Sequence, residues 1–332
     1  KILSKEENGK SVWFKDGELN TCFNCLDRHI NAGLGNKSAI IYDSPISNSK
    51  KILTYNQLLL DVSKLSNILI SLGVNKGDRV ILYMPMIPEV IVAMLACARI
   101  GAVHSVVFGG FAAQELSNRI NDSKPVVILS ASCGLEPNKV INYKKILDKA
   151  ISICLHKPKN QIIYQREQLN VELDKKGDLD WIKLISKENN HVAECVSVNS
   201  DDPLYILYTS GTTGIPKGIV RTNGGHAVAL YNSMIMTYDV KKEDVFWAAS
   251  DVGWVVGHSY IVYAPLLYGC TTVLYEGKPV GTPDAGQFWR VISEYSVSTM
   301  FTAPTAIRAI KKIDPLGEFI KKYNLNNFKY LF

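Results

Sequence analysis

Apolar residues between positions 54 and 72 recur at the spacing of one helix face. Leu58, Val62, Leu65 and Leu69 stand three or four residues apart along the chain. This period predicts an amphipathic helix over 54–72. Gly73 follows directly, and glycine is common just past a helix C-terminus. The pattern therefore predicts a helix that covers a hydrophobic core.

The next stretch alternates short apolar runs with helical segments. Residues 80–84, 103–108 and 126–129 are apolar runs typical of buried strands. Between them, residues 88–98 predict a helix opened by a proline, and residues 112–120 predict a second helix. Strand and helix alternating at this spacing favour the α/β class, with a mostly parallel sheet and right-handed crossovers.

A second α/β run follows a more polar middle region. Residues 144–199 predict a helix, a short strand near 162–164 and a polar surface excursion at 174–180. The elements predicted after that region are strands at 204–208, 245–249 and 272–275 and helices at 257–268 and 287–295. We expect two similar α/β lobes within one large domain.

The ends of the chain set the expected boundaries. Residues 1–50 are expected to form an amino-terminal segment, 51–199 the first lobe and 200–332 the second. Residues 328–332 have the pattern of a buried strand without a polar tail, which predicts an incomplete fragment. The chain begins with Lys1 and not Met, so the sequence leaves open whether a targeting peptide has been removed.

Composition and charge limit the kinds of ligand and partner that we expect for this protein. The chain has 332 residues, of which 47% are hydrophobic and 20% charged, which is enough for a sizeable core. The net charge of +6 suits small polyanionic ligands, but no dense Lys/Arg block supports nucleic-acid binding. No apolar run reaches membrane-spanning length. We therefore expect small-molecule substrates, no nucleic-acid partner and no membrane span.

The seven cysteines indicate a reducing compartment. Their odd number and scattered positions favour free thiols over a disulfide framework, which predicts the cytoplasm or the mitochondrial matrix. Cys22 and Cys25 form a Cys-x-x-Cys, a pattern that by itself hints at zinc or redox chemistry. No second cysteine pair and no spaced histidine pair completes such a site, so we expect no metal site in this chain.

The segment 209–218 carries the chemical argument. It follows the apolar run 204–208 and contains four hydroxyls, three glycines and one lysine, Lys217. Glycines let backbone N–H groups approach a phosphate, while hydroxyls and the lysine add donors and charge. The spacing differs from a Walker A loop, which disfavours a P-loop kinase or GTPase. The alternative is a flexible surface linker, an uncommon role directly behind a buried strand.

This segment resembles the phosphate loop of the adenylate-forming superfamily of acyl-CoA synthetases, peptide-synthetase adenylation domains and luciferases. Further segments resemble the acetyl- and propionyl-CoA synthetase branch of short-chain acyl-CoA synthetases, in the same order over nearly the whole chain. They are Trp13-Phe14, Asn24 to His29, Phe108 to Phe111, Ser250 to Tyr260, Tyr275 to Gly277 and Phe301 to Ala306. The resemblance implies the large amino-terminal domain of that fold, with its small carboxy-terminal domain absent.

The resemblance also implies chemistry. A carboxylate attacks the α-phosphate of ATP, pyrophosphate leaves, and the thiol of CoA then displaces AMP from the acyl-adenylate, with Mg²⁺ assisting. The residues that would wrap the ATP phosphates are Thr209, Ser210, Gly211, Thr212, Thr213, Gly214 and Lys217.

A second set of residues is implied for the acyl pocket and thiol site, namely Trp254, Val255, Val256, Gly257 and His258. Bulky apolar groups wall a small acyl pocket, although ordinary core packing is the alternative. Acetate-type relatives usually have threonine where this chain has Val256. The more apolar valine favours propionate, and an acetate-specific ligase is the alternative. For His258 we expect a positioning role and not a general base.

The CoA-binding residues implied by the resemblance are Glu136, Pro137, Asn138 and Lys139, with Val256 near the thiol. Acetate-type relatives carry arginines at the positions of Glu136 and Lys139. In this chain only Lys139 keeps a positive charge at these two positions, and a lysine lacks the planar guanidinium with which arginine binds a phosphate through two hydrogen bonds. A plain surface turn is the alternative for this segment.

The resemblance implies further parts beyond Phe332. These are a Thr-Glu pair for Mg²⁺, a tryptophan that sets acyl length, an aspartate for the ribose and a carboxy-terminal lysine. Catalysis of phosphoryl chemistry depends on such positioned charges. We therefore predict that this chain alone does not complete the reaction. A non-catalytic nucleotide- or acyl-CoA-binding module is the alternative from another functional class.

Overall fold

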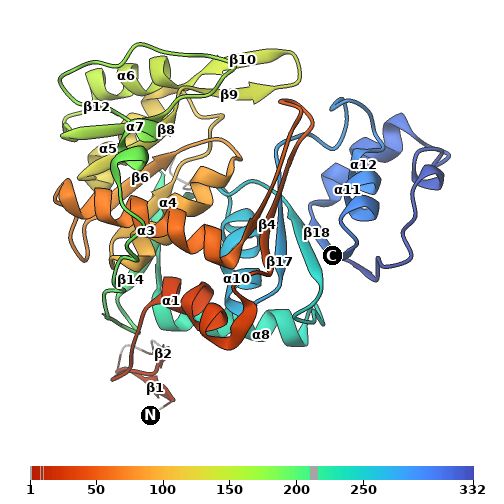
Figure 1. Ribbon diagram of the computed structural model, residues 1–332, viewed down its shortest axis with the longest axis horizontal. Coiled ribbons are helices and arrows are strands. Elements are labelled where there is room, and N and C mark those ends of the chain that lie inside the picture. Colours follow the sequence, from red (N-terminus) through yellow and green to blue (C-terminus); the bar gives the residue numbers. More distant parts are fainter. Residues whose placement is uncertain (1, 8, 10, 210–215) are drawn as a thin grey trace.

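The structure is a computed structural model that describes all residues except 1, 8, 10 and 210–215. Two large β-sheets, flanked by helices, form the body of the molecule (Figure 1). In that view the first sheet and its helices lie on the left, and the helices α11 and α12 lie on the right beyond the second sheet. The expected α/β class with mostly parallel sheets is confirmed.

The first sheet has seven strands, and all neighbours are parallel except the last pair. In sheet order they are β12 (Asp178–Asp180), β11 (Asn160–Tyr164), β8 (Val127–Ala131), β6 (Arg79–Tyr83), β7 (Val103–Val106), β14 (Pro203–Thr209) and β15 (Lys217–Thr222). The predicted strands near 80–84, 103–108, 126–129 and 162–164 are thus confirmed within a few residues. The polar stretch 174–180 was expected to be a surface excursion. That was wrong at its end, because β12 pairs with β11 as an edge strand.

The second sheet has six strands, parallel except for the hairpin at one edge. In sheet order they are β19 (Tyr330–Leu331), β18 (Val297–Thr302), β16 (Val245–Ala249), β17 (Thr271–Tyr275), β4 (Ser38–Ser44) and β5 (Ser49–Thr54). Residues 328–332 were expected to form a buried strand. Only the pair in β19 is a strand, and its side chains are exposed because it lies at the sheet edge.

Sheet membership crosses the expected boundaries of 1–50, 51–199 and 200–332. The hairpin β14–β15 follows residue 200 but completes the first sheet, and β4–β5 precedes the first lobe but completes the second. β4 pairs in parallel with β17, more than 200 residues away, in a register that sets Ile40 beside Thr272. Such long-range pairing is not encoded in local periodicity, so the sheets are interwoven along the chain.

Helices cover both sheets. The longer ones are α3 (Tyr55–Ser71), α4 (Pro88–Arg99), α5 (Ala113–Ser123), α6 (Tyr143–Ile153), α8 (Asn223–Met236), α11 (Gln287–Glu294) and α12 (Pro304–Ile313). The predicted helix over 54–72 is confirmed as α3. It begins at a capping box in which the Thr54 side chain accepts the Gln57 N–H. The predicted helix at 257–268 is confirmed as the run α9 (Val255–Gly257), a π-helical stretch η2 (His258–Tyr263) and α10 (Ala264–Tyr268).

Short elements complete the chain. They are β1 (Leu3–Lys5), β2 (Ser11–Trp13), β3 (Glu18–Leu19), α1 (Thr21–Cys25), α2 (Asp27–His29), the π-helical η1 (Ile30–Leu34), β9 (Cys133–Glu136), β10 (Lys139–Asn142), α7 (Trp181–Lys187), β13 (Val198–Asn199) and the 3₁₀ helix η3 (Ile320–Lys322). β9 and β10 form an antiparallel hairpin that projects from the first sheet at the top of Figure 1.

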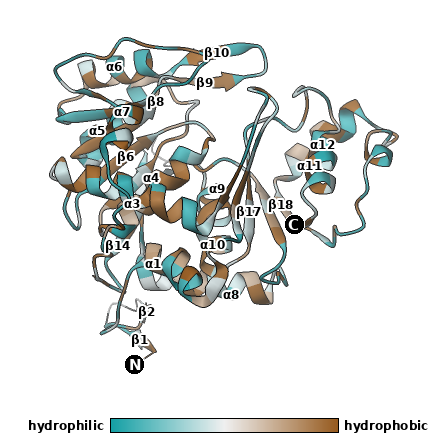
Figure 2. Cartoon of the chain, viewed as in Figure 1, coloured by the Kyte–Doolittle hydropathy of each residue, from teal (hydrophilic) through white to brown (hydrophobic). Residues whose placement is uncertain are grey.

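The core is continuous between the two sheets. Helix α4 is buried at every position except Glu89 and apolar except at Glu89 and Arg99, and one hydrophobic cluster joins it to strands of both sheets. Figure 2 shows much of this helix in the brown of hydrophobic residues. Burying a large aliphatic side chain contributes roughly 1.5–3 kcal/mol, so this cluster dominates the stability of the fold. In the part of the chain that is described, no helix has the length and apolar character to cross a membrane.

Candidate active site

A first cavity of about 210 Å³ lies where both sheets present the carboxyl ends of their parallel strands. Four segments that follow strands line it, namely 84–86 after β6, 108–110 after β7, 249–251 at the end of β16 and 275–279 at the end of β17. In α/β sheets, ligands bind outside the carboxyl ends of the strands. The topology therefore makes this cavity a candidate binding site before any side chain is considered.

Tyr143 forms part of the floor of the first cavity, and glycines make room for it. Its ring stacks on that of Tyr83 at 4.7 Å between centroids. A Cβ on Gly109 would overlap the Tyr143 hydroxyl, and one on Gly134 would approach the same ring to 2.5 Å. The Phe108 to Phe111 motif thus contains a glycine where no side chain fits.

The predicted CoA segment, Glu136 to Lys139, is the tip of the β9–β10 hairpin. Pro137, Asn138 and Lys139 are exposed, whereas Glu136 lines the first cavity. The Glu136 carboxylate pairs with Lys278 Nζ at 3.0 Å. Lys278 was not singled out from the sequence, and it places a second cation beside the hairpin. The carboxylate of Glu136 therefore has a cationic partner beside the predicted CoA segment.

A second cavity, of about 610 Å³, contains two of the predicted acyl-site residues. Val255 and Val256 line it together with His226 of α8 and the segment 220–222 of β15. The predicted apolar wall thus faces the strand that leads out of the predicted phosphate loop. His226 was missed from the sequence, because a lone histidine in a helix carries no distinguishing local pattern.

The predicted phosphate loop joins β14 to β15. Thr209 and Lys217 are paired in register as the last and first residues of these strands, and Lys217 is exposed. The remaining predicted loop residues lie outside the described part of the chain; they are Ser210, Gly211, Thr212, Thr213 and Gly214. The hairpin therefore holds both ends of the loop at a fixed spacing.

Trp254, predicted for the acyl pocket, lines neither cavity among the described residues. Its side chain is 49% exposed, and its ring lies 5.4 Å from Phe108 and 6.3 Å from Phe111 between centroids. Gly257 has no room for a side chain, since an added Cβ would overlap the backbone carbonyl of Asp251. The turn that carries Trp254 is therefore held tightly against the Phe108 loop.

His258 is fully buried and lines neither cavity among the described residues. Its Nε2 lies 3.0 Å from Nε2 of His104, which in turn is 3.1 Å from the Tyr263 hydroxyl. Burial lowers the pKa of His258 well below its usual value and lowers the pKa values of His104 and His226 to about 3. The cluster is therefore uncharged at neutral pH, and His258 supports the wall from behind.

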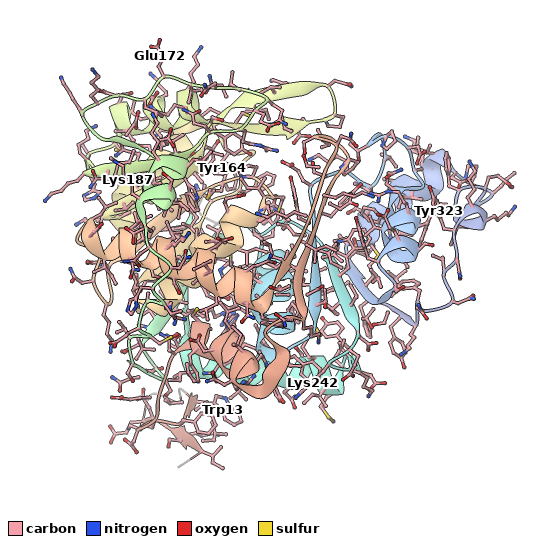
Figure 3. All side chains as sticks on the ribbon, viewed as in Figure 1. Trp13, Tyr164, Glu172, Lys187, Lys242 and Tyr323 are labelled. Carbon is pink, nitrogen blue, oxygen red and sulfur yellow. The ribbon has the colours of Figure 1, made fainter. Side chains whose placement is uncertain are left out.

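An ion pair that sequence reasoning missed joins the two sheets beside the first cavity. Arg166, two residues past β11, donates to both oxygens of Glu276 at 2.7 and 2.9 Å, and both side chains are 5% exposed. Tyr42 and Ser44 of β4 donate to the same carboxylate at 2.8 and 2.9 Å. Figure 3 shows Tyr164, the last residue of β11 and two residues before Arg166, on the side of the first sheet. These contacts fix the cavity walls relative to each other.

The Cys-x-x-Cys belongs to the hydrophobic core. Cys22 and Cys25 are buried on helix α1, and all seven cysteines are free thiols. Arg99 Nη1 donates to Cys22 Sγ at 3.6 Å and also pairs with Asp27 at 2.8 Å. Within the described residues, no group of three or more His, Cys, Asp or Glu side chains has a geometry for a metal ion. Packing and the Arg99 contacts therefore account for this motif.

Comparison with known proteins identifies the family. A family model described as AMP-binding enzyme matches residues 27–332. The Bos taurus acyl-CoA synthetase short-chain family member 3, mitochondrial, is 54% identical over 333 residues, which cover 100% of this chain and 48% of that protein. Its Dictyostelium discoideum relative, acyl-CoA synthetase short-chain family member B, mitochondrial, is 46% identical, with 99% and 48% covered.

The acetyl-coenzyme A synthetase of Leptospira biflexa is 43% identical over 325 residues, covering 97% of this chain and 49% of that protein. The chain thus spans about half the length of the curated relatives it matches. The resemblance seen in the motifs is confirmed. The chain belongs to the AMP-binding enzyme family and is similar over its whole length to short-chain acyl-CoA synthetases.

Proposed function

We propose that the protein is an ATP-dependent short-chain carboxylate–CoA ligase that works through an acyl-adenylate. The observation that carries the proposal is the second cavity, where Val255 and Val256 face residues 220–222 of β15. An apolar wall for a short acyl chain and the strand leading out of a phosphate loop share one space. A carboxylate bound there lies on the side of the molecule where the loop would hold ATP.

Thr209, Lys217 and the loop between them would bind the ATP phosphates. Backbone N–H groups and hydroxyls suit the phosphate oxygens, and the exposed Lys217 ammonium adds positive charge. Mg²⁺ would neutralise phosphate charge when bound with ATP. Positioned charges of this kind supply most of the catalysis in phosphoryl transfer.

The first cavity would receive the CoA arm. Next to its lining residue Glu136 lies the exposed hairpin tip with Asn138 and Lys139, and Lys278, which also lines the cavity, carries a second positive charge paired with Glu136. Such charges suit the phosphates of the CoA nucleotide. Trp254 packs on Phe108, which lines this cavity, and directly precedes Val255, which lines the second cavity. Two adjoining cavities fit two successive half-reactions, adenylation and then thioester formation.

We further propose propionate as the preferred acid. Val256 presents methyl groups to the second cavity, and acetate-type relatives usually have a threonine hydroxyl at this position. One methylene in an apolar pocket is worth roughly 1–3 kcal/mol, so both acids would react with different efficiency. An acetate-specific ligase is the alternative.

The test is acid-dependent exchange of labelled pyrophosphate into ATP by the full-length protein, with acetate, propionate and butyrate side by side. We expect the highest kcat/KM with propionate. Val256→Thr should shift the ratio toward acetate by roughly 10-fold or more. The control is Val140→Thr, the same change at an exposed position on β10 outside both cavities.

Each outcome has a defined meaning. Highest exchange with acetate keeps the ligase and rejects the propionate preference. No exchange with any of the three acids, alongside measurable nucleotide or acyl-CoA binding, supports the non-catalytic binding module. For location we propose the mitochondrial matrix or the cytoplasm, since relatives carry a mitochondrial name and the seven cysteines are free thiols.

A further inference from the structure

The first cavity contains a half-buried carboxyl group that none of the predicted roles uses. Asp251 follows β16 and lines the cavity between the two sheets. Its Oδ1 accepts the backbone N–H of Gly253 at 2.7 Å, and its backbone carbonyl accepts the N–H of Trp254 at 3.0 Å. These two contacts fix the side chain at the mouth of the turn, so its position relative to the cavity is set.

The charged neighbours of Asp251 do not neutralise it. Lys278 and Glu136, which line the same cavity, pair with each other at 3.0 Å, and Tyr143 of α6 faces the group with a neutral hydroxyl. Among the described residues, no lysine, arginine or histidine forms an ion pair with Asp251. Burial raises the pKa of Asp251 to about 6, Glu136 adds to the rise, and Lys278 and the Gly253 N–H oppose it.

A purely structural role does not explain a carboxyl at this position. Asparagine makes the same side-chain hydrogen bond to the N–H two residues on, and it carries no charge into the protein. A carboxylate that is partly removed from water and has no cationic partner opposes folding. Such groups in clefts are typical of functional sites. The carboxyl of Asp251 is therefore a candidate for a chemical role in the cavity that it lines.

We propose that Asp251 accepts the proton of the CoA thiol during thioester formation, a role that rests on the proposed ligase function. The thiol S–H bond breaks and its proton moves to the free carboxylate oxygen. The sulfur electron pair forms the C–S bond to the acyl carbon, and the bond from that carbon to the AMP phosphate oxygen breaks. AMP leaves with the electron pair, and the carboxyl group returns its proton to water.

The acidity of Asp251 suits this transfer. A thiol ordinarily titrates near about 8.5, and a base is most effective when its own pKa approaches the working pH. A carboxyl that titrates close to neutrality is a stronger base than one with the ordinary value of about 3.9, and it is still ionised at pH 7–8. The turn hydrogen bond to Gly253 occupies one oxygen and leaves the other for the thiol.

The test separates the two half-reactions in the full-length protein carrying Asp251→Asn. Pyrophosphate exchange should stay within about 3-fold of wild type. The single-turnover rate of CoA with preformed acyl-adenylate should fall by roughly 100- to 10,000-fold, the usual contribution of a general base. The matched control is Asp244→Asn, which removes a carboxylate just before the opposite end of β16, where it lies 3.9 Å from Lys329.

Two further readouts distinguish proton transfer from a structural effect. At pH values under about 6, the wild-type rate of thioester formation should decrease in proportion to the protonation of a single group. In Asp251→Asn this decrease at acidic pH should be absent. A replacement acceptor thiol of lower pKa should narrow the gap between the variant and wild type, because it ionises without help.

The outcomes are separable. A thioester rate in Asp251→Asn within about 3-fold of wild type overturns the proposal and leaves the ligase function intact. Equal losses in both half-reactions also overturn it, since they indicate a displaced turn. Absence of pyrophosphate exchange in the wild-type protein rejects the ligase function itself, before Asp251 is considered.

Discussion

The Arg166–Glu276 pair gives the sharpest prediction about stability. Substituting Arg166→Met removes the guanidinium but leaves Glu276 with the Tyr42 and Ser44 hydroxyls, at 2.8 and 2.9 Å. Substituting Glu276→Leu leaves the buried guanidinium of Arg166 without its carboxylate. The two single variants thus remove the same ion pair but leave different charges behind.

The expected magnitudes follow from burial. Both side chains are 5% exposed, so water cannot replace the lost partner. Breaking a buried pair costs about 3–5 kcal/mol, whereas replacing both partners by apolar groups of similar volume is often close to neutral. We expect Arg166→Met near the lower value, because two hydroxyls still serve Glu276, and Glu276→Leu near the upper value. The double variant should cost much less than the sum.

The assay is urea unfolding of the full-length wild type, both single variants and the double variant. The coupling energy is the difference between the double variant and the sum of the singles. The control is Glu318→Gln, which breaks a pair at 2.7 Å to Lys321 whose side chains are 61% and 62% exposed and should cost under about 1 kcal/mol. Single-variant losses below about 1 kcal/mol, or additive losses, would refute the account of a buried clamp.

Three further changes test local features. Gly257→Ala should destabilise the protein by at least about 2 kcal/mol in urea unfolding, because the added Cβ would overlap the Asp251 carbonyl. An unchanged free energy of unfolding would mean that the turn can shift to make room for the methyl group. Thr54→Ala should cost about 1 kcal/mol by loss of the capping box with Gln57, and no loss would contradict that cap. For Asp251, the folded pKa of about 6 lies above the unfolded value of about 3.9, so its stabilising contribution is complete below about pH 4 and is lost as pH rises through about 6. Asp251→Asn should therefore gain stability over wild type between pH 4 and 7, by up to about 3 kcal/mol, and a pH-independent difference would contradict this.

Elements with a strong local period were predictable from the sequence. Helix α3 has both an amphipathic period and a capping residue at its start, and the strands of the first sheet are short apolar runs between helices. The edge strands were not predictable from the sequence. β12 is polar and β19 is exposed, since an edge strand is held by backbone hydrogen bonds and not by burial of its side chains.

The sequence also did not predict which strands belong to the same sheet. The register between β4 and β17 joins residues more than 200 positions apart, and a local pattern records neither partner. The candidate site divides in the same way. Val256 was found because a family motif surrounds it, and it lines a cavity as expected. Lys278 and Arg166 were missed because their importance comes from partners that only the fold brings near, namely Glu136 and Glu276.

The turn between β16 and α9 connects the two cavities mechanically. Asp251 lines the first cavity and Val255 lines the second, only four residues later. Between them, an added Cβ on Gly253 would lie 2.8 Å from Phe108 Cα, which leaves the turn no space to shift without moving that loop. Because interiors this tightly packed transmit small displacements, a change in the acyl wall also moves the carboxyl that we assign to the thiol step. Variants that enlarge the acyl pocket should therefore slow thioester formation more than adenylation, even when the larger acid binds well.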